Sequence, residues 1–150
     1  MSTNDDFILA FRRLQGDVDQ WFVDLAAGSR LPRAPAVRAL ADAYLTANPP
    51  TLTVQVDVAG VDPAEMDIQL DGDLLVVRGV RRRPSSQRRV YQHAEIDWGP
   101  FERRVRLGVP VDADAVTASY DRGLLTIVLP LGDRAPSERI GIVVRGGEAG

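Results

Sequence analysis

The sequence predicts an all-β protein whose centre, from about Leu52 to Leu129, is an antiparallel β-sandwich. Two observations carry this prediction. Apolar residues recur at every second position in several short segments, and turn signals rich in Gly and Asp separate those segments at hairpin distances. No helical pattern interrupts the region, as it would in a parallel α/β fold. The short alternating segments therefore favour two packed antiparallel sheets.

The first strands are expected where the period becomes two. Residues 52–58 alternate between apolar and polar side chains, and residues 66–70 do so again after a turn at residues 60–63. The tight turn Asp71-Gly72-Asp73 predicts a hairpin into a third strand over residues 74–77.

The second half repeats the pattern after a long, polar and basic loop over residues 81–100. Alternation returns over residues 101–107 and again over residues 116–120. The turn Asp121-Arg122-Gly123 leads into a last sandwich strand over residues 124–129, and Pro130 ends it.

By composition the chain divides into residues 1–40, 41–131 and 132–150. Residues 29–50 contain four prolines and read as a linker with one strand over residues 41–46. Residues 1–28 predict an amphipathic helix. Its apolar residues follow heptad spacing, widened by two neighbours: Phe7, Phe11, Leu14, Val18, Trp21 and Leu25, with Ile8 and Phe22. A coiled coil and a helix docked on an apolar surface both fit this stripe, and the lack of complementary flanking charges favours the docked helix.

The residue types exclude most catalytic chemistry. The chain has no cysteine, which excludes disulfides, thiolate nucleophiles and Cys-ligated metals. All 18 basic residues are arginine, so a Schiff-base lysine is excluded too. His93 is the single histidine, and one histidine cannot build a typical zinc site. We expect no enzyme activity and no cofactor, and a role for His93 on the surface or at an interface.

The distribution of apolar and charged residues along the chain points to a cytoplasmic protein. No apolar run approaches the length of a membrane span, and the N-terminal residues are acidic before they become apolar, the wrong order for a secretory signal. We therefore expect a cytoplasmic protein with no membrane span.

Charge is unevenly distributed along the sandwich. Residues 51–77 carry six acidic residues and no arginine, whereas residues 78–106 carry nine arginines. The basic block could bind phosphate, but only Tyr91 offers a stacking ring beside the arginines of the loop, so nucleic-acid binding is disfavoured. The acidic block offers these arginines a counterpart inside the chain or in a second copy of it.

Arg103 is expected on the apolar side of its strand. It shares odd positions with Phe101, Val105 and Leu107, so its guanidinium points with their side chains. A buried charge of this kind needs a carboxylate or backbone carbonyls. A buried or interfacial pair is the favoured interpretation, and a head that reaches solvent at a sheet edge is the alternative.

The tract Ile140-Gly141-Ile142 is an isolated β-branched pair beyond a polar linker. Alternate residues of an extended segment share one face, so both isoleucines can enter two pockets of one groove. Strand addition into such a groove is the favoured use, and the linker lets the tract reach a neighbouring subunit and drive assembly. An ordinary last strand folded back on its own sheet is the alternative.

Four motifs together resemble the small heat shock proteins, the α-crystallin family. The segment ASYDRGLLTIVLP (118–130) resembles their A-x-x-x-N-G-x-L-T-x-x-x-P signature, and VDVAGVDP (56–63) resembles their D-x-P-G turn. FERRVRL (101–107) is similar to their F-x-R-x-F-x-L strand, and Ile140-Gly141-Ile142 matches their I-x-I tail motif. Three departures affect turns and packing only: Arg122 replaces Asn, Ala59 replaces Pro, and Val105 replaces an aromatic residue.

The resemblance implies an immunoglobulin-like sandwich, the α-crystallin domain, acting as an ATP-independent holdase that prevents aggregation of unfolding proteins. It implies a homo-oligomer of dimers that exchange a strand from the loop, with Arg103, Tyr91 and His93 at the dimer interface. It implies that the tail docks in a groove between residues 66–70 and 116–120. The groove residues are Met66, Ile68, Leu70, Val116 and Ala118.

The resemblance also implies that the N-terminal helix binds client proteins and that other chaperones release them. The helix residues expected to bind clients are Phe7, Phe11, Leu14, Trp21 and Phe22. ATP-dependent chaperones are the expected partners for client release. The rival hypothesis is a structural or adaptor protein on the same sandwich, such as a gas-vesicle accessory protein, and Ile140 and Ile142 count against a co-chaperone domain because such domains generally lack the tail.

Overall fold

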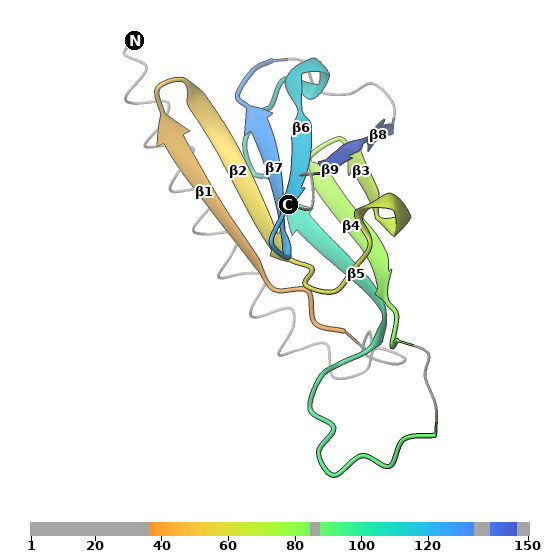
Figure 1. Ribbon diagram of the computed structural model, residues 1–150. Helices are drawn as coiled ribbons and strands as arrows, with labels where there is room; N and C mark the ends of the chain where they lie inside the picture. Colours follow the sequence, from red (N-terminus) through yellow and green to blue (C-terminus); the bar gives the residue numbers. More distant parts are fainter. Residues whose placement is uncertain (1–36, 85–87, 134–138, 147–150) are drawn as a thin grey trace, which may run out of the picture.

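The computed structural model describes residues 37–84, 88–133 and 139–146. Within these ranges the chain forms two sheets packed face to face, the predicted β-sandwich, and all strand pairs are antiparallel except that of β9 with β6 (Figure 1). The amphipathic helix expected over residues 1–28 lies outside the described residues.

The larger sheet, sheet A, has five strands in the order β1-β2-β7-β6-β9. The smaller sheet, sheet B, has four strands in the order β5-β4-β3-β8. The strands of sheet A are β1 (Ala41–Ala47), β2 (Pro50–Asp57), β7 (Leu124–Pro130), β6 (Thr117–Asp121) and β9 (Val144–Gly146). The strands of sheet B are β5 (Gly99–Arg106), β4 (Leu74–Arg81), β3 (Asp67–Asp71) and β8 (Ile140–Ile142). Two short 3-10 turns, η1 (Pro63–Glu65) and η2 (Ala113–Ala115), precede β3 and β6.

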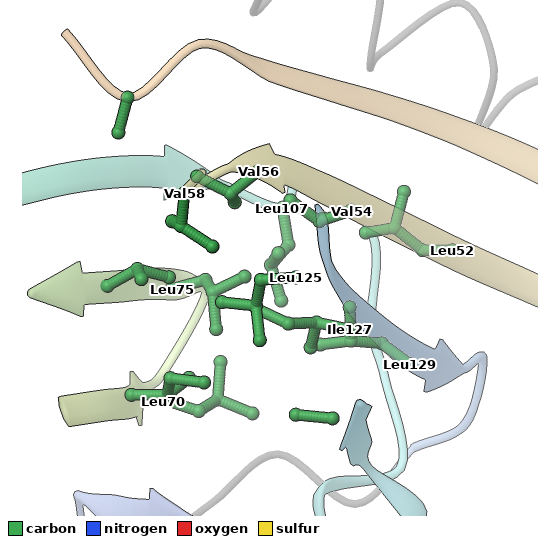
Figure 2. Packing of buried hydrophobic residues seen from close by; sticks show 14 of the residues in the cluster. Leu52, Val54, Val56, Val58, Leu70, Leu75, Leu107, Leu125, Ile127 and Leu129 are labelled. Atoms are coloured by element: carbon green, nitrogen blue, oxygen red, sulfur yellow. The ribbon is translucent and has the colours of Figure 1, made fainter. Parts of the chain in front are cut away.

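The core consists of the inward-facing side chains of both sheets. In β2 the alternation predicts the buried face correctly, because Leu52, Val54 and Val56 are completely buried. Leu70 and Leu75 of sheet B meet Leu125, Ile127 and Leu129 of β7 in the same cluster (Figure 2). The apolar residues at every second position therefore close the space between the sheets.

The packed region begins before the first strand. Val37 and Ala39 are buried in the core, and the amide of Asp57 donates to the carbonyl of Leu40. The linker expected over residues 29–50 therefore contributes to the core from Val37 onward. Its strand, expected over residues 41–46, is confirmed as β1 and pairs with β2 along its whole length.

Both tight hairpins contain residues in the left-handed region. Gly72 has φ +61° in the turn between β3 and β4. In the turn between β6 and β7, Arg122 has φ +48° and Gly123 has φ +85°. Arg122 thus adopts the positive φ for which Asn or Gly is the usual choice.

Candidate functional site

The candidate site is the open side of the sandwich, where β3 ends sheet B and β6 ends the main part of sheet A (Figure 1). On the β3 side, Ile68 and Leu70 are buried and Met66 packs against the core from a half-buried position. On the β6 side, Ala118 is buried and Val116 is half-buried. The structure therefore places Ile68, Leu70 and Ala118 on the two strands that border this side, and Met66 and Val116 immediately before those strands.

The tail segment Ile140–Ile142 forms β8 and pairs antiparallel with β3. Ile142 lies opposite Ile68, and Ile140 lies opposite Leu70. Both isoleucines are half-buried against the core while Gly141 is exposed, so the two side chains share one face as expected. The tail adds a strand to its own sheet here, the alternative that the sequence left open. Docking on a neighbouring copy remains a prediction, since the structure contains one chain.

An ion pair marks the start of the docked tail. Arg139 Nη2 lies 3.2 Å from Asp71 Oδ2, at the end of β3. Both side chains are more than half exposed, so the pair adds little stability and mainly favours one register of β8 on β3.

The groove remains open beside the docked tail. A cavity of about 420 Å³ lies between the tail and the start of β6. Ala113, Asp114, Val116 and Thr117 line it from one side, and Ile140 to Val143 with Arg145 line it from the other. The tail therefore fills the β3 side of the groove more fully than the side bordered by η2.

Tyr91 and His93 lie together in the long loop between β4 and β5. Both line a cavity of about 180 Å³ with Arg83, Glu95 and Trp98. The Arg83 guanidinium lies 4.7 Å from the centre of the Tyr91 ring and 5.8 Å from that of Trp98. A hydrogen bond with Arg89, and then one with Arg83, lowers the pKa of Tyr91. The described residues of this loop between Arg81 and Gly99 form no strand in the single chain.

Trp98 was not singled out from the sequence, and Arg83 was considered only as one of the arginines of the basic block. They are separated by 15 positions in a loop without periodicity, so no pattern indicated that they meet. The proximity of an arginine to two aromatic residues in the same loop was the available signal.

Arg103 lies apart from that loop cavity, on β5. It is half-buried beside the buried Phe101, opposite Val77 of β4, so it does point with the apolar side of its strand. Desolvation by this burial lowers the pKa of its guanidinium from the usual value. The exposed positions of the same strand carry Glu102, Arg104 and Arg106.

Much of the acidic block finds its arginine partners within the chain. Arg78 Nε donates to Glu102 Oε2 at 2.6 Å, and Arg78 also lies 3.7 Å from Asp67. Arg82 pairs with Glu65, and Arg106 pairs with Asp73. These contacts pair acidic residues of the first block with arginines of the second within one chain, and Asp67 and Arg78 face each other across β3 and β4.

The described part of the chain contains no group of three or more metal-ligating side chains. Within the same ranges, no helix has the length and apolar character to cross a membrane. The predicted client-binding residues Phe7, Phe11, Leu14, Trp21 and Phe22 lie outside the described residues.

Comparison with known proteins agrees with the fold. The profile of the Hsp20/alpha crystallin family matches residues 45–145. An "18 kDa heat shock protein" of Streptomyces albus G is 33% identical over 91 residues, which cover 60% of this chain and 64% of the relative. An "18 kDa antigen 2" of Mycobacterium avium is 30% identical over 126 residues, 84% of this chain and 86% of the relative.

Solved structures give the same result. HspA of Xanthomonas axonopodis superposes with a TM-score of 0.57 at 30% identity, covering 65% of this chain and 96% of that one. A small heat-shock protein of Xylella fastidiosa, whose structure is described as "a distinct high order structure", gives a TM-score of 0.53 at 30% identity, covering 69% and 96%.

The two-sheet sandwich, with a tail strand in the groove at its open side, is thus an α-crystallin domain. The chain belongs to the Hsp20/alpha crystallin family, the small heat shock proteins. Members of this family are non-enzymatic chaperones of the stress response.

Proposed function

We propose that this protein is an ATP-independent holdase, which binds unfolding proteins and prevents their aggregation. The observation that carries the proposal is the groove of a family sandwich occupied by the two isoleucines of its own tail. A holdase needs apolar surface that reversible self-association can cover, because permanently exposed patches aggregate. A short strand on a tether provides such a reversible cover.

The proposal includes a homo-oligomer built from strand-exchanged dimers. One observation supports this part of the proposal. β1 is an edge strand of sheet A, so its outer hydrogen-bonding edge can accept another strand. The loop that would supply this strand exposes large apolar side chains, with Val90 95% exposed and Ile96 64% exposed. Tyr91, His93 and Arg103 belong to the interface in this proposal. ATP-dependent chaperones remain the proposed partners for client release, and the cytoplasm the proposed location.

Residues 1–28 are the proposed client-binding segment. The test compares the full chain with a variant that lacks residues 1–28, measuring light scattering of a heat-denatured client protein at several chaperone-to-client ratios. We expect the full chain to suppress scattering and the truncated chain to suppress it less, while circular dichroism shows that its sandwich stays folded. Failure of the full chain to suppress aggregation would contradict the holdase function. Full protection by the truncated chain would reject only the assignment of the client site.

A further inference from the structure

The tail continues beyond its two isoleucines and joins the other sheet. After β8, residues Val144–Gly146 form β9, which pairs in parallel with β6. Val144 lies opposite Ala118, whose side chain is buried, and Gly146 lies opposite Tyr120. Figure 1 shows both short strands at the same side of the sandwich, β8 beside β3 and β9 beside β6.

Burial alternates from Ile140 to Arg145. Ile140, Ile142 and Val144 are half-buried and pack against the core. The residues between them, Gly141 and Val143, are exposed, and Val143 is 84% exposed. Since side chains of an extended segment alternate between its two faces, the three β-branched residues form one continuous apolar row.

The two strands of the tail serve different sheets. An extended segment has two hydrogen-bonding edges, and here β8 pairs on sheet B while β9 pairs on sheet A. The tail runs antiparallel to β3 and parallel to β6, so a single polarity satisfies both partners. The pair of Arg139 with Asp71 at its beginning favours this polarity.

We infer that the docking element is the segment 140–146 and that Val144 is a third anchor, which fastens the tail to sheet A. The tail then bridges the two sheets at the open side of the sandwich. The isoleucine pair attaches the tail to β3 of sheet B, and Val144 attaches it to β6 of sheet A. The partner that fits this surface is this chain's own tail sequence, an extended segment with β-branched residues at three alternate positions. A role of this bridging tail in assembly rests on the proposed function, whereas the positions of its three attached side chains follow from the pairing of the strands.

The test uses hydrogen–deuterium exchange on the full chain and two matched variants, Val144→Ser and Val143→Ser. The same substitution is made at adjacent positions, one half-buried and one exposed. In Val144→Ser we expect the amides of Ala118–Tyr120 to exchange about tenfold faster, while those of Ile68–Leu70 change much less. Val143→Ser should match the wild type at both edges, and Val144→Ile should keep the protection of the wild type.

Equal exchange at Ala118–Tyr120 in Val144→Ser and Val143→Ser would overturn the third anchor. Acceleration at both edges to the same extent would also overturn it, because β8 and β9 would then be a single unit without separate attachments. The native particle mass and client protection of the wild type are measured on the same sample. A wild-type protein that neither assembles nor protects clients would contradict the proposed function. The exchange comparison would still show whether Val144 attaches the tail to sheet A.

Discussion

Ile142 of the tail lies directly opposite Ile68 of β3, a side chain that is only 1% exposed. Ile140 takes the same place opposite Leu70. If this contact holds neighbouring subunits together, changing both isoleucines to Gly should reduce the particle to dimers or smaller species. The change removes two half-buried apolar side chains, which contribute about 1–2 kcal/mol each. Multi-angle light scattering measures the resulting mass.

The matched control for this change is Gly141→Ala. A Cβ at Gly141 meets no atom within 4 Å, and Gly141 is exposed, so the added methyl should leave the particle mass unchanged. An unchanged mass in the double variant would show that the isoleucines do not hold the assembly together.

Arg103→Ala should lower the stability of the dimer or change the size of the assembly. Arg103 lies opposite the buried Val77, and its truncation removes a half-buried stem together with its charge, a loss of about 1–3 kcal/mol. Arg103→Met keeps most of the stem and separates packing from charge. Thermal unfolding and light scattering provide the measurements. Profiles like the wild type for both variants would support an arginine that merely reaches solvent from its strand.

The alternation of apolar residues was sufficient to locate the sandwich and its inner face. In a strand with one buried face, period two fixes which side chains enter the core, as for Leu52, Val54 and Val56. The contribution of Val37 and Ala39 was missed, because single apolar residues between prolines and arginines carry no period. The tail motif was visible, but β9 was not. Its three residues include a glycine, and its pairing with β6 is a long-range contact that no local pattern encodes.

Arg122→Asn should stabilise the protein by about 0.5–1 kcal/mol. Arg122 has φ +48°, a conformation that Asn adopts more readily because its short polar side chain can hydrogen-bond to the nearby backbone. The ion pair with Asp121 that the change removes is almost fully solvated and contributes little. Urea denaturation at a fixed protein concentration measures the effect, because self-association shifts the apparent stability.

The comparison for this turn is Gly123→Ala, which should be destabilising. Gly123 has φ +85°, and a Cβ there would lie 3.1 Å from both the Cα and the Cβ of Ala59. An Arg122→Asn variant that is no more stable than the wild type would contradict the prediction that the positive φ of Arg122 costs stability.

Gly79→Ala should destabilise the sandwich by about 1–3 kcal/mol through overpacking. A Cβ at Gly79 would lie 2.7 Å from Cζ of Phe101, which is 3% exposed and sits opposite Gly79 across β4 and β5. Replacing the opposing ring by the smaller leucine side chain, Phe101→Leu, should recover part of the lost stability in the double variant. The effects of the two changes on stability should therefore be non-additive. Thermal unfolding of the single and double variants measures this coupling, and strict additivity would contradict the steric explanation.

Glu102→Gln should lower stability at neutral pH and should do so progressively less as the pH falls. The hydrogen bond from Arg78, and then the one from Arg104, holds the pKa of Glu102 below its usual value. A carboxyl group with a lowered folded-state pKa stabilises the protein above its unfolded pKa, and this contribution disappears as the pH falls through the folded value. Since the Glu102 side chain is 36% exposed, solvent screening limits the effect to less than about 1 kcal/mol.

The measurement is urea unfolding of the wild type and Glu102→Gln between pH 7 and pH 3. The difference in free energy of unfolding should be largest at pH 7 and should shrink below about pH 4.3, the ordinary value for glutamate. Arg78→Gln completes a double-mutant cycle, in which the second change should cost less once Glu102 is already neutral. A difference that stays constant down to pH 3 would place the effect of Glu102→Gln in packing, because a charge pair with Arg78 must weaken when the carboxylate is protonated.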